Sequence, residues 1–129
     1  MDAIWVVEPF LSAALGQGGR LVASNYVDTA PDLTVAVYFT SEQQIKNDPD
    51  LVKRFTDAMT ESLAYADAHP DEARQVLTSY TKIDEAAIKE LTLPKWPPDI
   101  NRASVETLAT LAVQDGLVTK QPDIDALLP

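Results

Sequence analysis

The stretch that decides the expected fold is Asp2-Ala3-Ile4-Trp5-Val6-Val7-Glu8-Pro9-Phe10. Its uncharged run 3–7 predicts a strand buried on both faces, as in a parallel sheet. Pro9 then suits the first turn of a helix, where its missing N–H costs nothing. A carboxylate, Glu8, is therefore expected at the carboxyl end of a strand, the edge where open α/β sheets hold ligands. Because such a strand belongs inside a sheet, we expect the chain to be the back portion of something larger.

Two more strands and a series of helices are predicted after this stretch. The residues 20–24 and 33–39 are mostly apolar and partly β-branched, which is typical of strands. A short helix over 9–17 is expected to end at Gly18-Gly19, because glycine adopts a positive φ at little cost. After residue 40 the pattern is helical, with about five helices. The expected fold class is α/β and predominantly helical, with a few short strands first.

The helical part carries clear start and stop signals. Ser41 with Gln44 forms a capping box, and Asp48-Pro49-Asp50 begins a long helix whose apolar stripe faces a core. The other expected helices begin near His69 and span Asp84 to about Leu91 and Asn101 to Gly116, with a last turn over 123–128. The apolar stripe of the long helix consists of Val52, Phe55, Met59, Leu63 and Ala66.

Composition excludes several classes of function. The chain has 10 Lys and Arg residues against 20 Asp and Glu, a net charge of −10. We therefore expect no nucleic-acid partner, because nucleic acids attract clustered positive charge. The chain has no cysteine, which excludes disulfides and thiolate metal sites. With no nucleophile-elbow serine and no phosphate-binding glycine loop, we expect no catalytic residue, no metal site, no cofactor and no enzymatic activity.

Two single residues invite functional interpretations that we do not favour. His69, the one histidine, stands beside Pro70 at a predicted helix start, so we expect it to cap a helix or lie on the surface. Trp96 lies in the proline-rich break 93–98, where a helix cannot continue. We expect Trp96 to lie over the core and hold this loop down rather than to recognise a peptide.

A series of short motifs follows one another in a recognisable order. It begins with Asp2-Ala3, Trp5 and Glu8-Pro9-Phe10, and it continues with Ser12-Ala13-Ala14 and Gly18-Gly19-Arg20-Leu21. Then come Asn47 to Val52, His69-Pro70-Asp71-Glu72-Ala73 and Asp115-Gly116-Leu117-Val118, with Lys120 and Pro122-Asp123 at the end. This order resembles the C-terminal part of the solute-binding proteins of ABC importers of the nitrate/sulfonate/taurine class. The resemblance covers nearly the whole chain.

The resemblance implies the extracytoplasmic solute-binding component of an ABC importer, which holds a small solute in a cleft between two lobes. It implies an incomplete portion of a type II periplasmic-binding-protein-like fold, with the export signal upstream of this chain. Residues 1–25 would end lobe two, residues 26–33 would form the hinge crossover, and residues 34–129 would form the helical C-terminal part of lobe one. The implied partners are the membrane subunits of the importer and a nitrate-, sulfonate- or taurine-like solute, bound only with the missing N-terminal part.

Two residues are the candidate ligand-binding residues. By resemblance, Glu8 occupies an acidic position that often faces the cleft, where it could accept hydrogen bonds or meet a cationic group or a metal. Its alternative is a first-turn carboxylate stabilised by the helix dipole. Trp5 could line a largely apolar pocket, or it could pack between the sheet and a helix.

A second hypothesis is a free-standing, mostly helical interaction module that binds no solute. An incomplete sheet leaves unpaired strand edges and an uncovered apolar face, and both promote association. We therefore expect this chain to dimerise through the exposed sheet edge, burying Ile4, Val6, Val35 and Val37 against a second copy.

Overall fold

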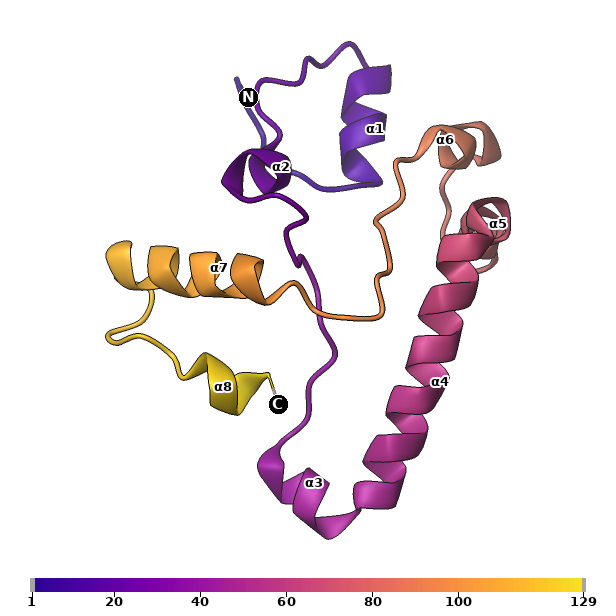
Figure 1. The fold of residues 1–129 in the computed structure, drawn as a ribbon. Coiled ribbons are helices and arrows are strands. Elements are labelled where there is room, and N and C mark those ends of the chain that lie inside the picture. Colours follow the sequence, from indigo (N-terminus) through magenta and orange to yellow (C-terminus); the bar gives the residue numbers. More distant parts are fainter. Residues whose placement is uncertain (1, 129) are drawn as a thin grey trace. The chain divides into compact units, whose positions relative to one another are not determined.

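The computed structural model describes residues 2–128. Within them the chain forms eight helices and no strand. The helices are α1 (Phe10–Gly16), α2 (Asn25–Thr29), α3 (Glu42–Asn47), α4 (Pro49–Ala68), α5 (Pro70–Tyr80), α6 (Glu85–Glu90), α7 (Arg102–Gln114) and α8 (Ile124–Leu127) (Figure 1).

The prediction of strands over 3–7, 20–24 and 33–39 is wrong for the described residues, and with it the expected α/β class. A helix completes its hydrogen bonds within one segment, whereas a strand needs a neighbouring strand to accept and donate. The first of these segments lies in one compact unit of the chain and the third lies in the other. None of the three meets a ladder partner among the residues described, so each remains irregular.

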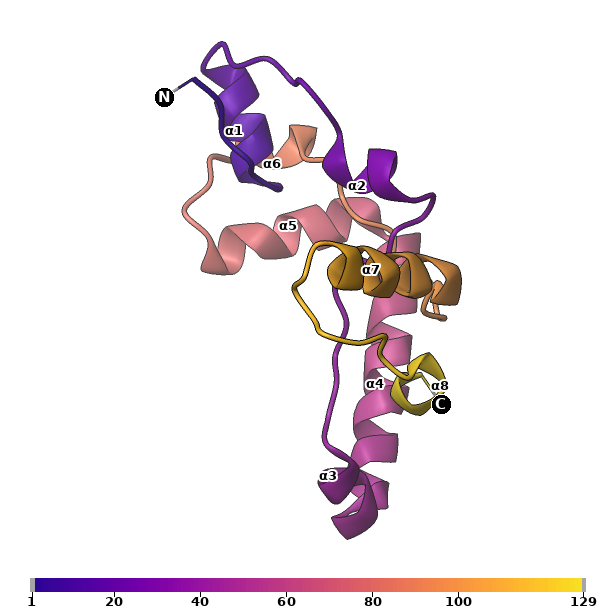
Figure 2. The same cartoon turned by 90° about the vertical axis from the view of Figure 1, so that its left-hand side faces the viewer.

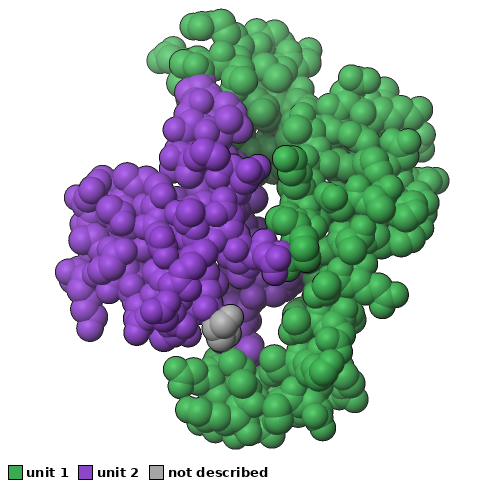
Figure 3. Space-filling model, in the orientation of Figure 1, with its two compact units in different colours: residues 1–22, 41–98 green, residues 23–40, 99–129 purple. Residues whose placement is uncertain are grey.

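The chain divides into two compact units (Figure 3). Unit 1 contains the residues up to Val22 together with Ser41–Pro98, and therefore the helices α1 and α3–α6. Unit 2 contains Ala23–Thr40 and the residues from Asp99 onward, and therefore the helices α2, α7 and α8.

Unit 1 is organised along α4. The helices α3 and α5 contact its opposite ends, α6 contacts α5, and α1 contacts α6 (Figures 1 and 2). Ile88 and Leu91 are almost completely buried, at 2% and 4% exposed. The apolar stripe of α4 is only half-buried, and Phe55 in its middle remains exposed.

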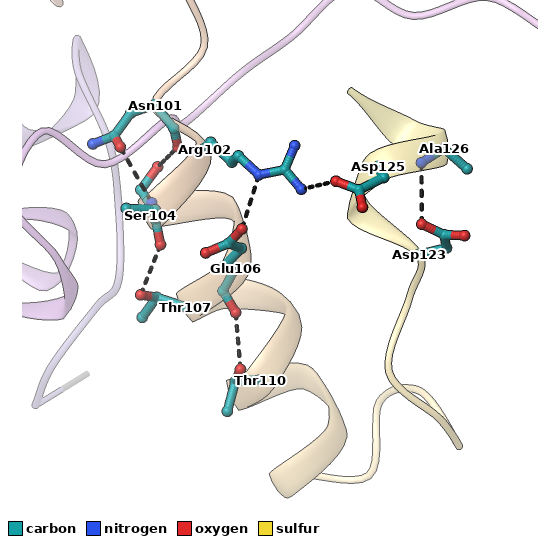
Figure 4. Close-up of polar contacts among 10 residues, drawn as sticks. Asn101, Arg102, Ser104, Glu106, Thr107, Thr110, Asp123, Asp125 and Ala126 are labelled. Atoms are coloured by element: carbon teal, nitrogen blue, oxygen red, sulfur yellow. Dashed lines mark hydrogen bonds and ion pairs between the residues drawn. The ribbon is translucent and has the colours of Figure 1, made fainter. Parts of the chain in front are cut away.

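Unit 2 has a small core of its own, formed by Ala30, Ala109 and Ile124 together with the buried hydroxyl residue Ser104. The chain turns after α7, and α8 lies alongside that helix (Figure 4). The α2 helix was not predicted, because its sequence reads as a turn-prone segment. The Asp28 carboxylate accepts a hydrogen bond from the Ser24 N–H, which closes this short helix at its start.

Predicted helix ends agree with the observed ones. The side chains of Ser41, Asp48, Asp84, Asn101 and Asp123 each accept a backbone N–H at the start of the following helix. The α1 helix ends in a Schellman motif, in which Gly18 has a φ of 88° and the Gly19 N–H donates to the Ala14 carbonyl. The α7 helix ends likewise at Gly116, with a φ of 72°.

Candidate functional site

Glu8 stands directly before α1 and is half-buried. One carboxylate oxygen accepts the Ser12 N–H at 3.1 Å, and the other accepts the Ser12 hydroxyl at 2.8 Å. Since the first N–H groups of a helix have no partner within the helix, this carboxylate supplies one. The geometry therefore agrees with the alternative interpretation of Glu8 as a carboxylate that stabilises a helix N-terminus. Its role toward a solute stays a prediction.

Trp5 is 66% exposed. The expectation that it packs between a sheet and a helix is wrong, because no sheet forms among the described residues. Its neighbour Val6 is half-buried and Val7 is 40% exposed. Trp5 and Glu8 thus belong to one short segment of unit 1, in which Trp5 is exposed and Glu8 is half-buried.

A small pocket of about 250 Å³ lies in unit 1, between the last turns of α4 and the proline-rich loop. The backbone N–H of Trp96 donates to the Asp67 carboxylate at 3.2 Å and ties the loop to α4, and Trp96 is half-buried. The role predicted for its indole ring stays a prediction. The pocket is smaller than most ligand sites, which span roughly 300–1,000 Å³. It is lined by Thr60, Ala64, Asp67, Ala68, Trp96, Pro97 and Pro98.

A second hollow of about 310 Å³ runs along α7 in unit 2. Three of its polar side chains already have partners within the helix. Thr107 and Thr110 donate their hydroxyls to helix carbonyls, and Glu106 accepts from Arg102 (Figure 4). Because one helix supplies every residue that lines it, this hollow does not enclose a ligand.

The most highly connected polar cluster joins the start of α7 to the segment 31–34, and we call it the Asn101 clasp. The Asn101 side-chain amide donates to the carbonyls of Pro31 and Asp32 at 3.2 and 2.9 Å. The Asn101 N–H donates to the Thr34 hydroxyl at 3.2 Å, and the Thr34 N–H donates to the Ser104 hydroxyl at 3.0 Å. Ser104 is only 2% exposed and donates in turn to the Asn101 carbonyl.

The clasp holds the backbone of residues 31–34 against the start of α7. Asp32 adopts a left-handed backbone with a φ of 47°, a conformation that aspartate tolerates better than most residues. Its carbonyl thereby meets the Asn101 amide. The sequence identified Asn101 as the start of a helix, but no local pattern links it to residues about 70 positions earlier. The clasp is a structural cluster whose groups satisfy one another.

Arg102 ties α8 to α7. Its guanidinium donates to the Glu106 carboxylate at 2.9 Å and also to the Asp125 carboxylate (Figure 4). The hydrogen bond to Asp125, followed by the one to Glu106, raises the pKa of Arg102 further above its ordinary value. The ion pair between Arg102 and Asp125 is exposed, so it orients α8 more than it stabilises the fold.

His69 lies at the junction of α4 and α5, where it ends one helix and begins the next. Its ring stacks on Tyr65 with centroids 4.0 Å apart, and its Nδ1 lies 2.8 Å from the Tyr65 carbonyl oxygen. The Tyr65 hydroxyl donates to Glu72 at 2.8 Å, and this hydrogen bond raises the pKa of Tyr65. The expectation that His69 is a cap or surface residue is confirmed.

Residues 2–128 contain no group of three or more His, Asp or Glu residues placed to hold a metal ion. None of the described helices has the length and apolar character needed to cross a lipid bilayer.

Comparison with known families gives one match. The family model described as NMT1/THI5 like matches residues 1–73 of this chain, more than half of its 129 residues. This is a family of nitrate/sulfonate/taurine-type ABC solute-binding proteins, so the resemblance drawn from the sequence motifs is confirmed. The match ends at Ala73, where the His69-Pro70-Asp71-Glu72-Ala73 motif ends. No curated protein and no solved structure matches the chain.

Proposed function

This chain belongs to the NMT1/THI5-like family, and from that premise we propose that it forms the C-terminal part of the solute-binding component of an ABC importer. The observation that carries the proposal is the match over residues 1–73, which include both candidate ligand residues, Trp5 and Glu8. Members of the family are mostly substrate-binding proteins, although one namesake takes part in thiamine synthesis. We propose binding without catalysis for this chain.

The proposed architecture is a portion of a type II periplasmic-binding-protein-like fold. In it residues 1–25 end lobe two, residues 26–33 cross between the lobes, and residues 34–129 belong to lobe one. The many exposed apolar side chains support this proposal, because they offer the surface that a further part of the fold would cover. The family is typically extracytoplasmic, and we propose the same location for the protein that contains this chain.

The solute is proposed to be a small nitrate-, sulfonate- or taurine-like molecule, with Glu8 and Trp5 among the residues that contact it. The chemistry of Glu8 makes the proposal more specific. A carboxylate repels a nitrate or a sulfonate group but attracts an ammonium group, and charge-assisted hydrogen bonds are among the strongest polar contacts. If Glu8 faces the solute, the preferred solute is therefore a zwitterion such as taurine, whose ammonium group meets the carboxylate.

Calorimetry of the full-length protein with taurine, ethanesulfonate and nitrate tests this proposal. We expect binding of taurine, and we expect Glu8→Gln to weaken it by about 10- to 100-fold, which is the effect of losing one charged hydrogen bond. Ethanesulfonate lacks the amine, so its affinity should not fall in the same variant and should rise as the repulsion of its sulfonate by the carboxylate is removed.

Glu42→Gln is the matched control, because Glu42 is also an acidic residue at the start of a helix. It should leave taurine binding unchanged. No binding of any of the three solutes contradicts the proposed transport function. Binding with equal affinity in wild type and Glu8→Gln removes Glu8 from the site while leaving the function in place.

A second candidate function is self-association by a mostly helical module. It is favoured by one observation, the uncharged and exposed segment 35–39 in unit 2.

A further inference from the structure

The Glu8 carboxylate is held by a single residue, Ser12, through both of its oxygens. One oxygen accepts the Ser12 N–H at 3.1 Å, and the other accepts the Ser12 hydroxyl at 2.8 Å. Both residues are half-buried and belong to unit 1. Because hydrogen bonds weaken steeply away from linearity, two of them to two different oxygens restrict both the swing and the rotation of the carboxylate. Ser12 therefore fixes the direction in which the carboxylate points.

The place of Ser12 at the start of α1 makes this contact differ from those around it. The N–H groups on either side of Ser12 donate to main-chain carbonyls four residues earlier, as in any helix. The Ser12 N–H donates to the Glu8 side chain instead, and the hydroxyl adds a second donor to the same carboxylate. An alanine at this position would supply the first of these donors but not the second.

The two hydrogen bonds from Ser12 leave acceptor capacity on the Glu8 carboxylate. An ionised carboxylate has about four acceptor positions on its two oxygens. Within residues 2–128 Ser12 takes two of them, one on each oxygen. Each oxygen can therefore accept from a further donor. A primary ammonium group suits such an acceptor, since it is compact and carries three N–H donors, whereas a trimethylated ammonium group carries none.

We propose that Ser12 is a positioning residue for the solute site, which aims the Glu8 carboxylate at a primary ammonium group and so selects solutes with a primary amine over their N-methylated analogues. The inference rests on the proposed solute-binding function and on the contact proposed there for Glu8. Attraction between opposite charges needs no particular direction, whereas an N–H···O hydrogen bond does. A carboxylate that is ordered in advance also loses less side-chain freedom when the solute binds.

Calorimetry of the full-length protein with taurine and ethanesulfonate tests the role of the hydroxyl. Ser12→Ala should weaken taurine binding by about three- to tenfold, which is the effect of losing the order of one flexible side chain. Ser12→Thr keeps a hydroxyl and should restore the affinity. Ethanesulfonate has no N–H to offer, so it should bind Ser12→Ala as it binds wild type.

Ser79→Ala is the matched control. Ser79 lies in α5 of the same unit, and its hydroxyl donates to the Val76 carbonyl at 2.7 Å rather than to a carboxylate. The same substitution there should leave taurine binding unchanged.

A further solute separates the direction of the carboxylate from its charge. N,N,N-trimethyltaurine carries the same two charges as taurine but no N–H group. Wild type should bind it at least about tenfold more weakly than taurine, because the hydrogen bonds to Glu8 are lost. Ser12→Ala should narrow this difference, since its carboxylate is no longer aimed. Equal affinity of wild type for the two solutes, or a difference that Ser12→Ala leaves unchanged, overturns the proposal.

The remaining outcomes distinguish this inference from the proposed function. If Glu8→Gln weakens taurine binding but Ser12→Ala does not, the positioning role is overturned and the function stands. A loss in Ser12→Ala that extends equally to ethanesulfonate, or that Ser12→Thr fails to restore, also overturns the positioning role. If wild type binds none of the solutes, the proposed function fails and this inference fails with it.

Discussion

The helices of this chain and its segment 35–39 satisfy their backbones in opposite ways. The long helix α4 begins where Asp48 accepts the Leu51 N–H, and the backbone hydrogen bonds of a helix lie within its own turns. The segment 35–39 forms no ladder among the described residues, although its side chains are typical of a strand. The difference shows that a helix forms its backbone hydrogen bonds within one segment, whereas a strand needs a neighbouring strand to form them.

The Asn101 clasp joins the start of α7 to the residues just before 35–39. Its removal should lower the free energy of unfolding more than the substitutions described after it. Asn101→Ala deletes the helix cap of α7 and both amide hydrogen bonds to the segment 31–34. We expect a loss of about 2–3 kcal/mol in the free energy of unfolding, measured by urea denaturation followed by circular dichroism.

Asn47→Ala is the control for this substitution, since Asn47 is exposed at the end of α3 and accepts only from Gln43. It should cost less than about 0.5 kcal/mol. Equal losses in the two variants would mean that the clasp does not hold unit 2 together.

Two glycines around the end of α1 should respond in opposite directions to the same substitution. A Cβ at Gly19 would stand 2.6 Å from the Ala14 carbonyl oxygen, so Gly19→Ala forces the backbone apart at an expected cost of about 1–2 kcal/mol. A Cβ at Gly16 meets nothing within 4 Å, and Gly16→Ala should stabilise by roughly 0.5–1 kcal/mol. Thermal denaturation measures whether each variant is more or less stable than wild type. A stabilising Gly19→Ala would show that the Schellman motif does not form.

The start of α4 can be weakened at Asp48, the residue that caps it. Asp48→Ala removes the side chain that accepts the Leu51 N–H at 3.0 Å, and we expect a loss of about 1 kcal/mol. Asp50→Ala leaves this cap in place and removes only a charge from the first turn, so a few tenths of a kcal/mol is the expected cost. Urea denaturation of the two variants distinguishes a cap from a general charge effect.

The smallest expected effect is a change in the pKa of Tyr65, at the junction of α4 and α5. Glu72→Gln should lower the pKa of Tyr65 toward its ordinary value, since the hydrogen bond to the Glu72 carboxylate is the main cause of the raised pKa. Absorbance of the phenolate during a pH titration measures the change, with Glu90→Gln as the control.

The sign of the associated stability effect follows from the raised pKa of Tyr65 in the folded chain. The contribution of this pair is fully present below the pKa of an unfolded tyrosine, and it disappears as the pH rises through the folded value. A titration of Tyr65 that is identical in wild type and Glu72→Gln would exclude the hydrogen bond as the cause.

Features that depend on neighbouring residues could be predicted from the sequence. The glycine stops at Gly18 and Gly116 and the caps at Asp48 and Asn101 follow from local backbone chemistry, and the structure agrees with them. The α2 helix escaped prediction, because its five residues carry no periodicity from which to recognise a helix.

Features that depend on distant residues could not be predicted in the same way. The strand over 33–39 was predicted from composition alone, but a strand exists only with a partner that composition does not supply. For the candidate site, the sequence named Glu8 as a first-turn carboxylate stabilised by the helix dipole, and the structure supplied Ser12 as its hydrogen-bond partner. The clasp joins Thr34 to Ser104 across 70 positions, a distance over which no sequence period acts.

The central claim is that the helices complete their backbone hydrogen bonds within one segment, whereas residues 35–39 form no ladder among residues 2–128. Hydrogen exchange measured by mass spectrometry tests it most directly. We expect the α4 amides to exchange at least tenfold more slowly than the amides of residues 35–39. Equal protection of the two segments would contradict the claim.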